Sequence, residues 1–176
     1  NRYAATDEAG SRWLVTLIDN TLVVSSPSEV ELRDAISKLS ALSGVGLRLP
    51  AVAAVDDDLG CAFAAEPDGG ERTLERYLAD EGRLDAHAAT ALLSALASAL
   101  VPVHAAGLAH RALTDDCVFV SRDAGKLKTT LGGFADGFAQ PSKKAIELDT
   151  GARIAPEIAE GQRGGAAADV WALAAI

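Results

Sequence analysis

The sequence predicts an α+β fold in two parts, and three observations support this prediction. Short apolar runs separated by Gly- and Asp-rich turns fill the first third of the chain, with one helical stretch among them. The middle of the chain carries a long helical pattern of apolar residues. Between them the composition changes abruptly over Glu66-Pro67-Asp68-Gly69-Gly70. We therefore expect a small, mostly β part over residues 1–66, a connection at 67–70 and a mostly α part over 71–176.

The first part contains four expected strands and one helix. Residues 3–7 and 12–18 form a hairpin around Gly10, and residues 49–55 and 60–65 are two further short strands. The helix begins at Glu29, where acidic residues in the first turn favour a helix start, and continues to about Ala41. Its apolar face is expected at Leu32, Ala35, Ile36, Leu39 and Leu42.

The second part begins with a short amphipathic helix over residues 73–78. Asp85 is the expected cap of a longer helix that ends before Gly107. Residues 118–120 and 126–130 then read as a hairpin, and a last helix follows Gly165. The apolar stripe of the long helix is expected at Ala89, Leu92, Leu93, Leu96, Leu100 and Val103.

Composition narrows the range of partners. A net charge of -9 over 176 residues argues against binding to nucleic acid or to an anionic membrane face, so we expect protein partners. The two cysteines, Cys61 and Cys117, lie far apart without metal-ligand spacing, and buried thiols are expected. No apolar run approaches about 18 residues, so no direct membrane contact is expected from this stretch. The first residue is Asn1, which indicates a piece of a longer protein whose membrane anchor would lie outside it.

One motif suggests a specific chemistry. His110-Arg111-Ala112 is followed five residues later by Cys117 and then by an apolar strand. This resembles the catalytic loop of protein kinases, H-R-D-L-x-x-x-N, in which the Asp orients the attacking hydroxyl and the Asn holds Mg²⁺. Ala112 and Cys117 stand at those two positions. A methyl group accepts no proton, and a thiol is a poor ligand for a hard cation.

Three more positions depart from the kinase pattern. Residues 12–18 resemble the V-A-I-K strand with Thr16 at the lysine position, and residues 29–41 resemble the following helix with Ala35 at the glutamate position. Asp34 lies one residue from that glutamate position, so a register slip is open. Leu131-Gly132-Gly133 is aligned with D-F-G, which puts Leu131 at the metal-binding Asp. Asp136-Gly137-Phe138 imitates D-F-G in composition but falls too late, and we reject it.

Framework positions of the kinase pattern are retained. Ala155-Pro156-Glu157 matches A-P-E, and Asp169-Val170-Trp171 resembles D-V-W, where the Asp ties its helix to the catalytic-loop backbone. Together with His110 and Arg111, these motifs imply a protein kinase-like bilobal fold over essentially the whole chain. The resemblance lacks the first strands and the Gly-rich loop. Its C-lobe is incomplete, either because the fragment is short or because the fold has been trimmed.

The resemblance implies an inactive pseudokinase with no catalytic, cofactor-binding or metal-binding residues. Leu14 above and Phe119 below the adenine position would fill the nucleotide pocket further. A docking role controlled by phosphorylation is then the expected function. The acceptor candidates are Thr150, which precedes A-P-E and has a structural hydroxyl as its alternative reading, followed by Ser142 and Thr129.

A narrower resemblance concerns Trp13-Leu14-Val15-Thr16. This run is similar to the intracellular kinase-like domain of actinobacterial MviN-like lipid II flippases. That likeness implies a cytoplasmic domain tethered to the inner membrane through regions outside this chain, with a role in peptidoglycan synthesis. It also implies two partners, an active Ser/Thr kinase and a protein with a forkhead-associated domain.

Two alternatives stay open at this point. The first is a divergent ATP-binding phosphotransferase in which Asp115, Asp116 or Asp136 replaces the lost metal ligands. Those acidic residues read equally well as a solvated loop. The second alternative is a passive scaffold domain without a switch.

Overall fold

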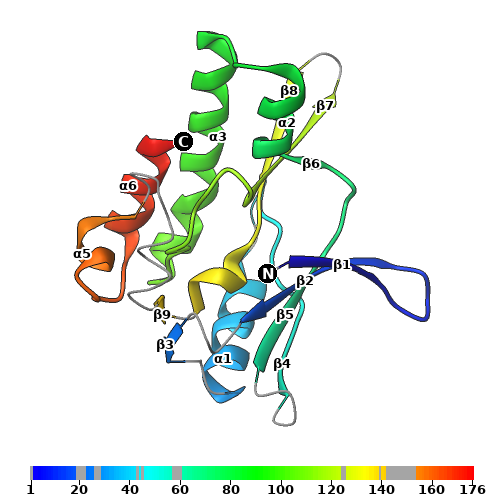
Figure 1. The fold of residues 1–176 in the computed structure, drawn as a ribbon, viewed down its shortest axis with the longest axis vertical. Coiled ribbons are helices and arrows are strands. Elements are labelled where there is room, and N and C mark those ends of the chain that lie inside the picture. Colours follow the sequence, from blue (N-terminus) through cyan, green and yellow to red (C-terminus); the bar gives the residue numbers. More distant parts are fainter. Residues whose placement is uncertain are drawn as a thin grey trace.

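The computed structural model describes residues 2–18, 23–25, 29–42, 44, 46–56, 61–123, 126–138, 140–141 and 154–176. The chain forms two lobes (Figure 1). The first lobe is a four-stranded antiparallel sheet in the order β1-β2-β5-β4, packed against one helix. Its elements are β1 (Arg2–Thr6), β2 (Arg12–Ile18), β3 (Val23–Ser25), α1 (Glu29–Ser40), β4 (Val52–Asp56) and β5 (Cys61–Pro67).

The second lobe is mostly helical and carries a three-stranded sheet in the order β6-β7-β8. A short strand, β9, returns to pair with β3 of the first lobe. The elements are β6 (Arg72–Thr73), α2 (Leu74–Glu81), α3 (Ala86–Ala105), β7 (Val118–Asp123), β8 (Lys126–Leu131), the 3₁₀ helix η1 (Phe134–Phe138), β9 (Gln140–Pro141), α5 (Pro156–Ala159) and α6 (Ala166–Ala175).

Helix α1 packs on the first sheet through one apolar face. Leu32 contacts Ile18 and Ala62, and Ile36 contacts Ala64 and η1. Leu39, one turn further, reaches the core of the second lobe. The helix therefore joins the two lobes.

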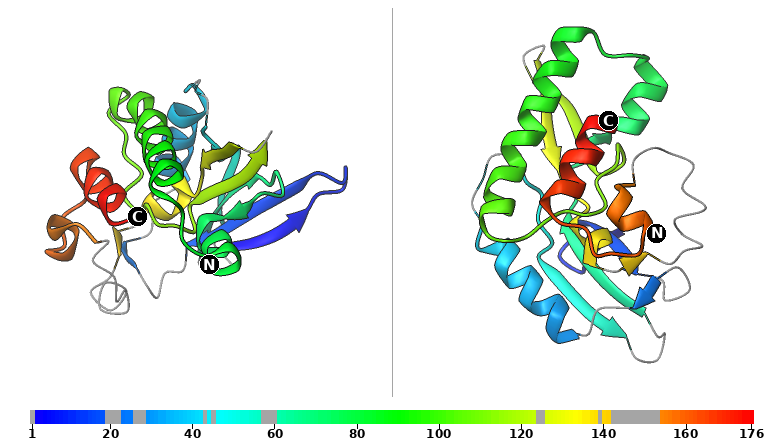
Figure 2. Two further views of the ribbon diagram at one scale, coloured as in Figure 1. Left: turned by 90° about the horizontal axis from the view of Figure 1, so that it is seen from above. Right: turned by 90° about the vertical axis from the view of Figure 1, so that its left-hand side faces the viewer.

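Helix α3 is the centre of the second lobe. It lies against β8 and α6, as the two views of Figure 2 show. Asp85 caps it as expected, with its carboxylate accepting from the Ala88 N–H at 2.7 Å. By length and hydropathy α3 could cross a membrane, but its buried residues pack on the β7-β8 hairpin as those of a core helix do.

The expected elements are present with shifted bounds: β4 covers Val52–Asp56 where 49–55 was expected, and α2 covers Leu74–Glu81 where 73–78 was expected. Strand β5 continues through Pro67, which pairs with Trp13 of β2, so extended structure reaches one residue into the predicted connection. Leu93, which was expected in the apolar stripe of α3, lies outside the buried face and is 38% exposed, while Ala99 joins that face. Residues three or four positions apart share one face of a helix, so the sequence alone is compatible with either Leu93 or Ala99 on the buried face. Packing against the neighbouring elements selects Ala99.

Leu96 gives a direct test of this core. Its side chain is fully buried, so Leu96→Ala removes methyl groups and leaves a cavity. We expect the free energy of unfolding to fall by about 2–5 kcal/mol in chemical denaturation. The matched control is Leu93→Ala on the same helix, for which we expect a much smaller loss because the side chain is partly solvated. Equal losses would contradict the packing described here.

Candidate functional site

A buried carboxylate on α6 holds the loop that begins at His110. Asp169 is fully buried and accepts from the backbone N–H of His110 at 2.8 Å and of Arg111 at 2.6 Å. The His104 ring nitrogen lies 2.8 Å from the same carboxylate. The contact expected between this Asp and the loop backbone is therefore present.

Arg111 needs this support. It has a positive φ of 66°, a left-handed conformation that costs a residue with a Cβ roughly 1–2 kcal/mol. Its Nε also donates to the Gly164 carbonyl at 2.7 Å. Burial, with Arg163 nearby, lowers the pKa of Arg111. Backbone strain at a loop of this kind persists only where surrounding contacts determine it.

His110 connects the loop to the segment after β8. Its ring is fully buried, lies 4.6 Å from the Phe134 ring and pairs with the Gly132 carbonyl at 2.8 Å. Burial lowers the pKa of His110, which keeps the imidazole neutral. Gly137 approaches the loop so closely that an added Cβ would clash with the His110 carbonyl.

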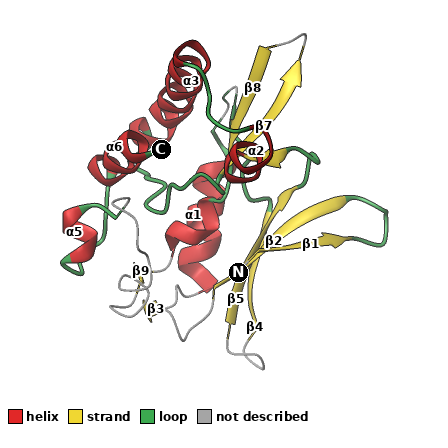
Figure 3. Ribbon diagram, turned by 45° about the horizontal axis from the view of Figure 1, so that its top comes forward, coloured by secondary structure: helices red, strands yellow, loops and turns green. Residues whose placement is uncertain are grey.

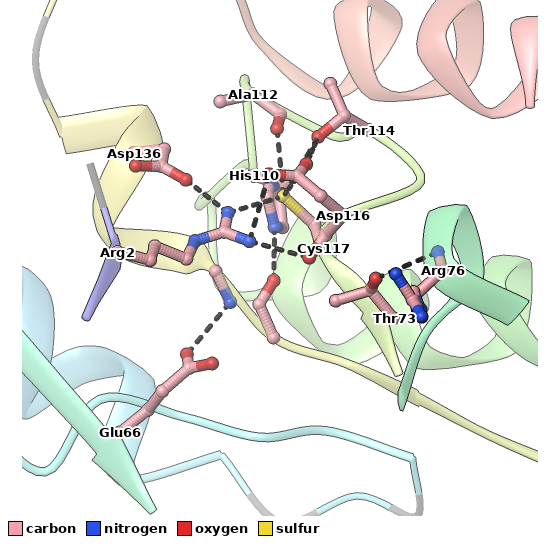
Figure 4. A network of polar contacts seen from close by, with 12 residues as sticks. Arg2, Glu66, Thr73, Arg76, His110, Ala112, Thr114, Asp116, Cys117 and Asp136 are labelled. Carbon is pink, nitrogen blue, oxygen red and sulfur yellow. Dashed lines mark hydrogen bonds and ion pairs between the residues drawn. The ribbon is translucent and has the colours of Figure 1, made fainter. Parts of the chain in front are cut away.

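Cys117 ends the loop as a buried thiol. Its Sγ donates to the Ala112 carbonyl at 3.3 Å and lies 3.3 Å from the Thr114 hydroxyl. Burial raises the pKa of Cys117 to about 11, so the thiol keeps its proton at neutral pH. Ala112 therefore contributes only its backbone carbonyl to this arrangement (Figure 4).

The guanidinium of Arg2, from β1, lies among the acidic groups of this loop (Figure 4). It donates to the Asp116 carbonyl at 2.6 Å and to the Cys117 Sγ at 2.9 Å, and it forms ion pairs with Asp116 and Asp136. Burial opposes its charge, but the neighbouring acidic groups outweigh burial and raise the pKa of Arg2. Because the thiol is protonated at neutral pH, the two carboxylates hold the cation there.

Gly133, and not Leu131, faces this cation. Leu131 is fully buried in the core, with its N–H and carbonyl paired to Gly46 and Arg48. An added Cβ at Gly133 would lie 2.9 Å from the Cys117 Sγ and 2.5 Å from an Arg2 nitrogen. Leu131 therefore does not face this loop, and the ring that packs against His110 is that of Phe134.

Glu66, at the end of β5, reaches the same region from the first lobe. Its carboxylate is buried and accepts from the Gly133 N–H at 2.8 Å, while its Oε1 has no hydrogen-bond partner among the described residues. Burial raises the pKa of Glu66, and the Gly133 N–H and Arg48 oppose that shift only in part. A buried carboxylate with one unpaired oxygen is a site where water is expected.

Thr16 and Ala35 lie on different elements, β2 and α1. Thr16 is buried on β2 opposite Ala64 of β5, and the α1 residue that packs on Ala64 is Ile36. Ala35 is half-buried and lines a small surface pocket with Arg111. Asp34, the alternative in that register, is exposed and pairs with Lys38.

Leu14 and Phe119, the two residues expected around the adenine position, lie on β2 and β7. Phe119 is buried, and the Arg48 guanidinium lies 3.8 Å from its ring centroid and pairs with Glu71. An added Cβ at Gly132 would meet both Phe119 and Glu66, so these side chains border the same space.

These residues do not fit a magnesium nucleotide. Among the described residues, no group of three or more His, Cys, Asp or Glu side chains could hold a metal ion. Asp116 and Asp136 converge on Arg2 instead, so a positive charge already lies between them. Mg²⁺ prefers oxygen ligands, and Cys117 and Gly133 offer none through their side chains.

The remaining predicted residues lie as follows. Glu157 is half-buried in α5, and Thr129 is half-buried in β8, paired with Val120. Ser142 and Thr150 fall outside the described residues.

The sequence motifs missed Arg2 and Glu66, since neither position belongs to a motif that could have pointed to it.

Comparison with known proteins identifies the fold. The structure is similar to the crystal structure of the Mycobacterium tuberculosis PknI kinase domain, with a TM-score of 0.70 and 20% sequence identity, covering 98% of this chain and 65% of that chain. A single mutant of that domain matches with a TM-score of 0.73, 20% identity and the same coverage. No family model and no curated protein matches this chain. The chain thus has a protein kinase-like, two-lobed α+β fold and spans about 65% of the length of the matched kinase domain.

The raised pKa of Glu66 predicts a pH-dependent stability. Below the ordinary glutamate value of 4.5 the carboxyl is protonated in both states, and as pH rises the unfolded chain loses this proton first. We expect wild type to lose stability relative to Glu66→Gln from about that pH upward, until the folded-state carboxyl has ionised. Urea denaturation of both proteins across pH measures this, and a difference that stays constant with pH would contradict the burial effect.

Proposed function

We propose, from the kinase-like fold and this lobe junction, that the chain is a catalytically inactive pseudokinase of the bacterial Ser/Thr kinase-like superfamily that acts as a docking and regulatory module. The observation that carries the proposal is the position of the Arg2 guanidinium, held between Asp116, Asp136 and Cys117. In this proposal, the tethered side-chain cation takes the place of the metal ion that a kinase would need beside this loop.

The chemistry of phosphoryl transfer supports this reading. Catalysis there consists of positioning and charge neutralisation by lysine, metal ligands and a base. Ala112, Cys117 and Thr16 supply none of these, and Gly133 has no side chain toward the loop. Each missing group removes transition-state stabilisation that the others cannot replace.

A regulatory role by docking agrees with the charge and with the retained framework. Asp169 and His110 hold the loop in place without any nucleotide-binding group. The resemblance of residues 13–16 to MviN-like lipid II flippases supports a place in bacterial cell-wall synthesis, as a cytoplasmic domain attached to the inner membrane by other regions. The proposed partners are an active Ser/Thr kinase and a forkhead-associated domain protein.

The structure describes one of the three phosphosite candidates, Thr129. Thr129 is half-buried and its backbone is paired within the β7-β8 hairpin, so a kinase could reach it only by opening β8. Ser142 and Thr150 lie outside the described residues, and Thr150 keeps the first place that its position before A-P-E gives it. We therefore place Thr150 first and Thr129 last.

A divergent ATP-binding enzyme is the second candidate. Asp116 and Asp136 converge on one cation, so displacement of Arg2 would leave two carboxylates facing each other. This is the one observation that favours displaced metal ligands. The backbone carbonyl of Asp115 accepts from the Glu75 N–H of α2 at 3.2 Å.

Nucleotide binding is tested by thermal unfolding. We expect ATP with Mg²⁺ or Mn²⁺ to leave the melting temperature of the chain unchanged, because Arg2 occupies the cation position. A ligand present at a hundredfold its Kd would raise the free energy of unfolding by about 2.7 kcal/mol, and this gain would give a clear rise in melting temperature. An active kinase domain serves as the positive control. A clear rise for this chain would instead support the divergent enzyme.

Phosphorylation is tested with an active Ser/Thr kinase and mass spectrometry. We expect phosphate on the segment 142–150, with Thr150→Ala reducing incorporation and Thr129→Ala leaving it unchanged. The phosphorylated chain should then bind an isolated forkhead-associated domain, and the unmodified chain should not bind it. If no phosphate is incorporated anywhere, a passive scaffold becomes the better description.

A further inference from the structure

A second hollow lies far from the lobe junction, at the end of the molecule where the α2–α3 connection meets the β7-β8 hairpin. Figure 3 shows α2 beside β7 at this end. The pocket has a volume of about 660 Å³ and is lined by residues of both segments. It is therefore large enough to receive side chains of another polypeptide.

The charge of this pocket differs from that of the whole chain. Arg83, Arg122 and Lys126 line it, although the chain carries a net charge of -9. Of its two acidic residues, Glu81 is paired with Arg72 at 3.1 Å and Asp85 caps α3 through the Ala88 N–H. Within the described part of the chain, the side chains of Arg83 and Lys126 form no ion pair or hydrogen bond. Their charges are thus available to an external anion.

One side of the pocket is apolar and is supported by the core of the second lobe. Leu84 and Leu127 line it and pack against the core of the second lobe. Tyr77 is buried, and Arg122 donates to its hydroxyl, so this arginine is fixed against the wall while the other two cations stay free. Apolar surface beside fixed and free cations suits a chain that alternates acidic and aliphatic residues.

We propose that this pocket binds an acidic peptide segment of a partner protein, with carboxylate or phosphate groups on Arg83 and Lys126 and an aliphatic side chain on Leu84 and Leu127. The inference rests on the proposed docking function and assigns the surface and partner chemistry that carry it. It does not depend on Arg2 or on the lobe junction.

The probe is a fluorescein-labelled peptide of alternating glutamate and leucine, measured by fluorescence anisotropy with the whole chain. A version with one phosphothreonine and a version with lysine in place of glutamate complete the set. We expect both acidic peptides to bind and to weaken as salt rises, and the lysine peptide not to bind. Binding of the phosphothreonine version alone would name phosphate as the anion, whereas equal binding of the lysine peptide would overturn the proposal.

Two variants locate the binding. Lys126→Glu should weaken the acidic peptide by about tenfold, which corresponds to about 1.4 kcal/mol. Lys128→Glu makes the same charge change on an exposed residue of the same strand outside the pocket, and it should have a much smaller effect. Unchanged melting temperatures would show that both variants fold. Equal effects of the two variants would overturn the proposal.

Further outcomes separate this inference from the function on which it rests. Anionic vesicles that bind in a Lys126-dependent way, with no peptide binding, would assign the pocket to a membrane surface and overturn the proposal. Absence of peptide binding, together with an unchanged melting temperature in ATP and Mg²⁺, would overturn the pocket assignment and leave the proposed pseudokinase function standing.

Discussion

The arrangement of the lobe junction depends on the buried carboxylate of Asp169. A buried charge is tolerated only where donors replace the water it has lost, and here two successive backbone N–H groups and the His104 ring surround it. These contacts stabilise the left-handed Arg111 and fix the direction of the loop that follows. The positions of Asp116 and Cys117, and thus of everything that meets them, follow from this one interaction.

The first lobe meets this loop with two residues of opposite charge. Arg2 reaches the acidic groups of the loop, while Glu66 reaches the backbone N–H of Gly133. The glycines at 132 and 133 make this possible, since a Cβ at either position would collide with one of these side chains or with Phe119 and Cys117. Kinase-like architecture is kept, but its central contacts are direct protein contacts between the lobes.

Local signals in the sequence were sufficient for most of the fold. Signals between neighbouring residues predicted the Asp85 cap, the start of α1 at Glu29 and the apolar periodicity of α3. The resemblance to kinases predicted the contact of Asp169 with the loop backbone. Contacts between distant segments were not predictable in this way. Arg2 and Asp136 are 134 residues apart, and two consecutive glycines left the register after β8 undetermined until packing placed Phe134 on His110. Likewise, Ala35 and Ile36 are both apolar, and the sequence does not show which of them packs on the sheet. In the structure Ile36 packs on Ala64 of β5.

A guanidinium built into the chain differs from a dissolved ion in one respect that matters in the cell. It cannot dissociate or be diluted, because its local concentration is fixed by the strand that carries it. Breaking this contact between the strand and the loop therefore requires a competing charge or a movement of the strand, because the guanidinium itself cannot diffuse away.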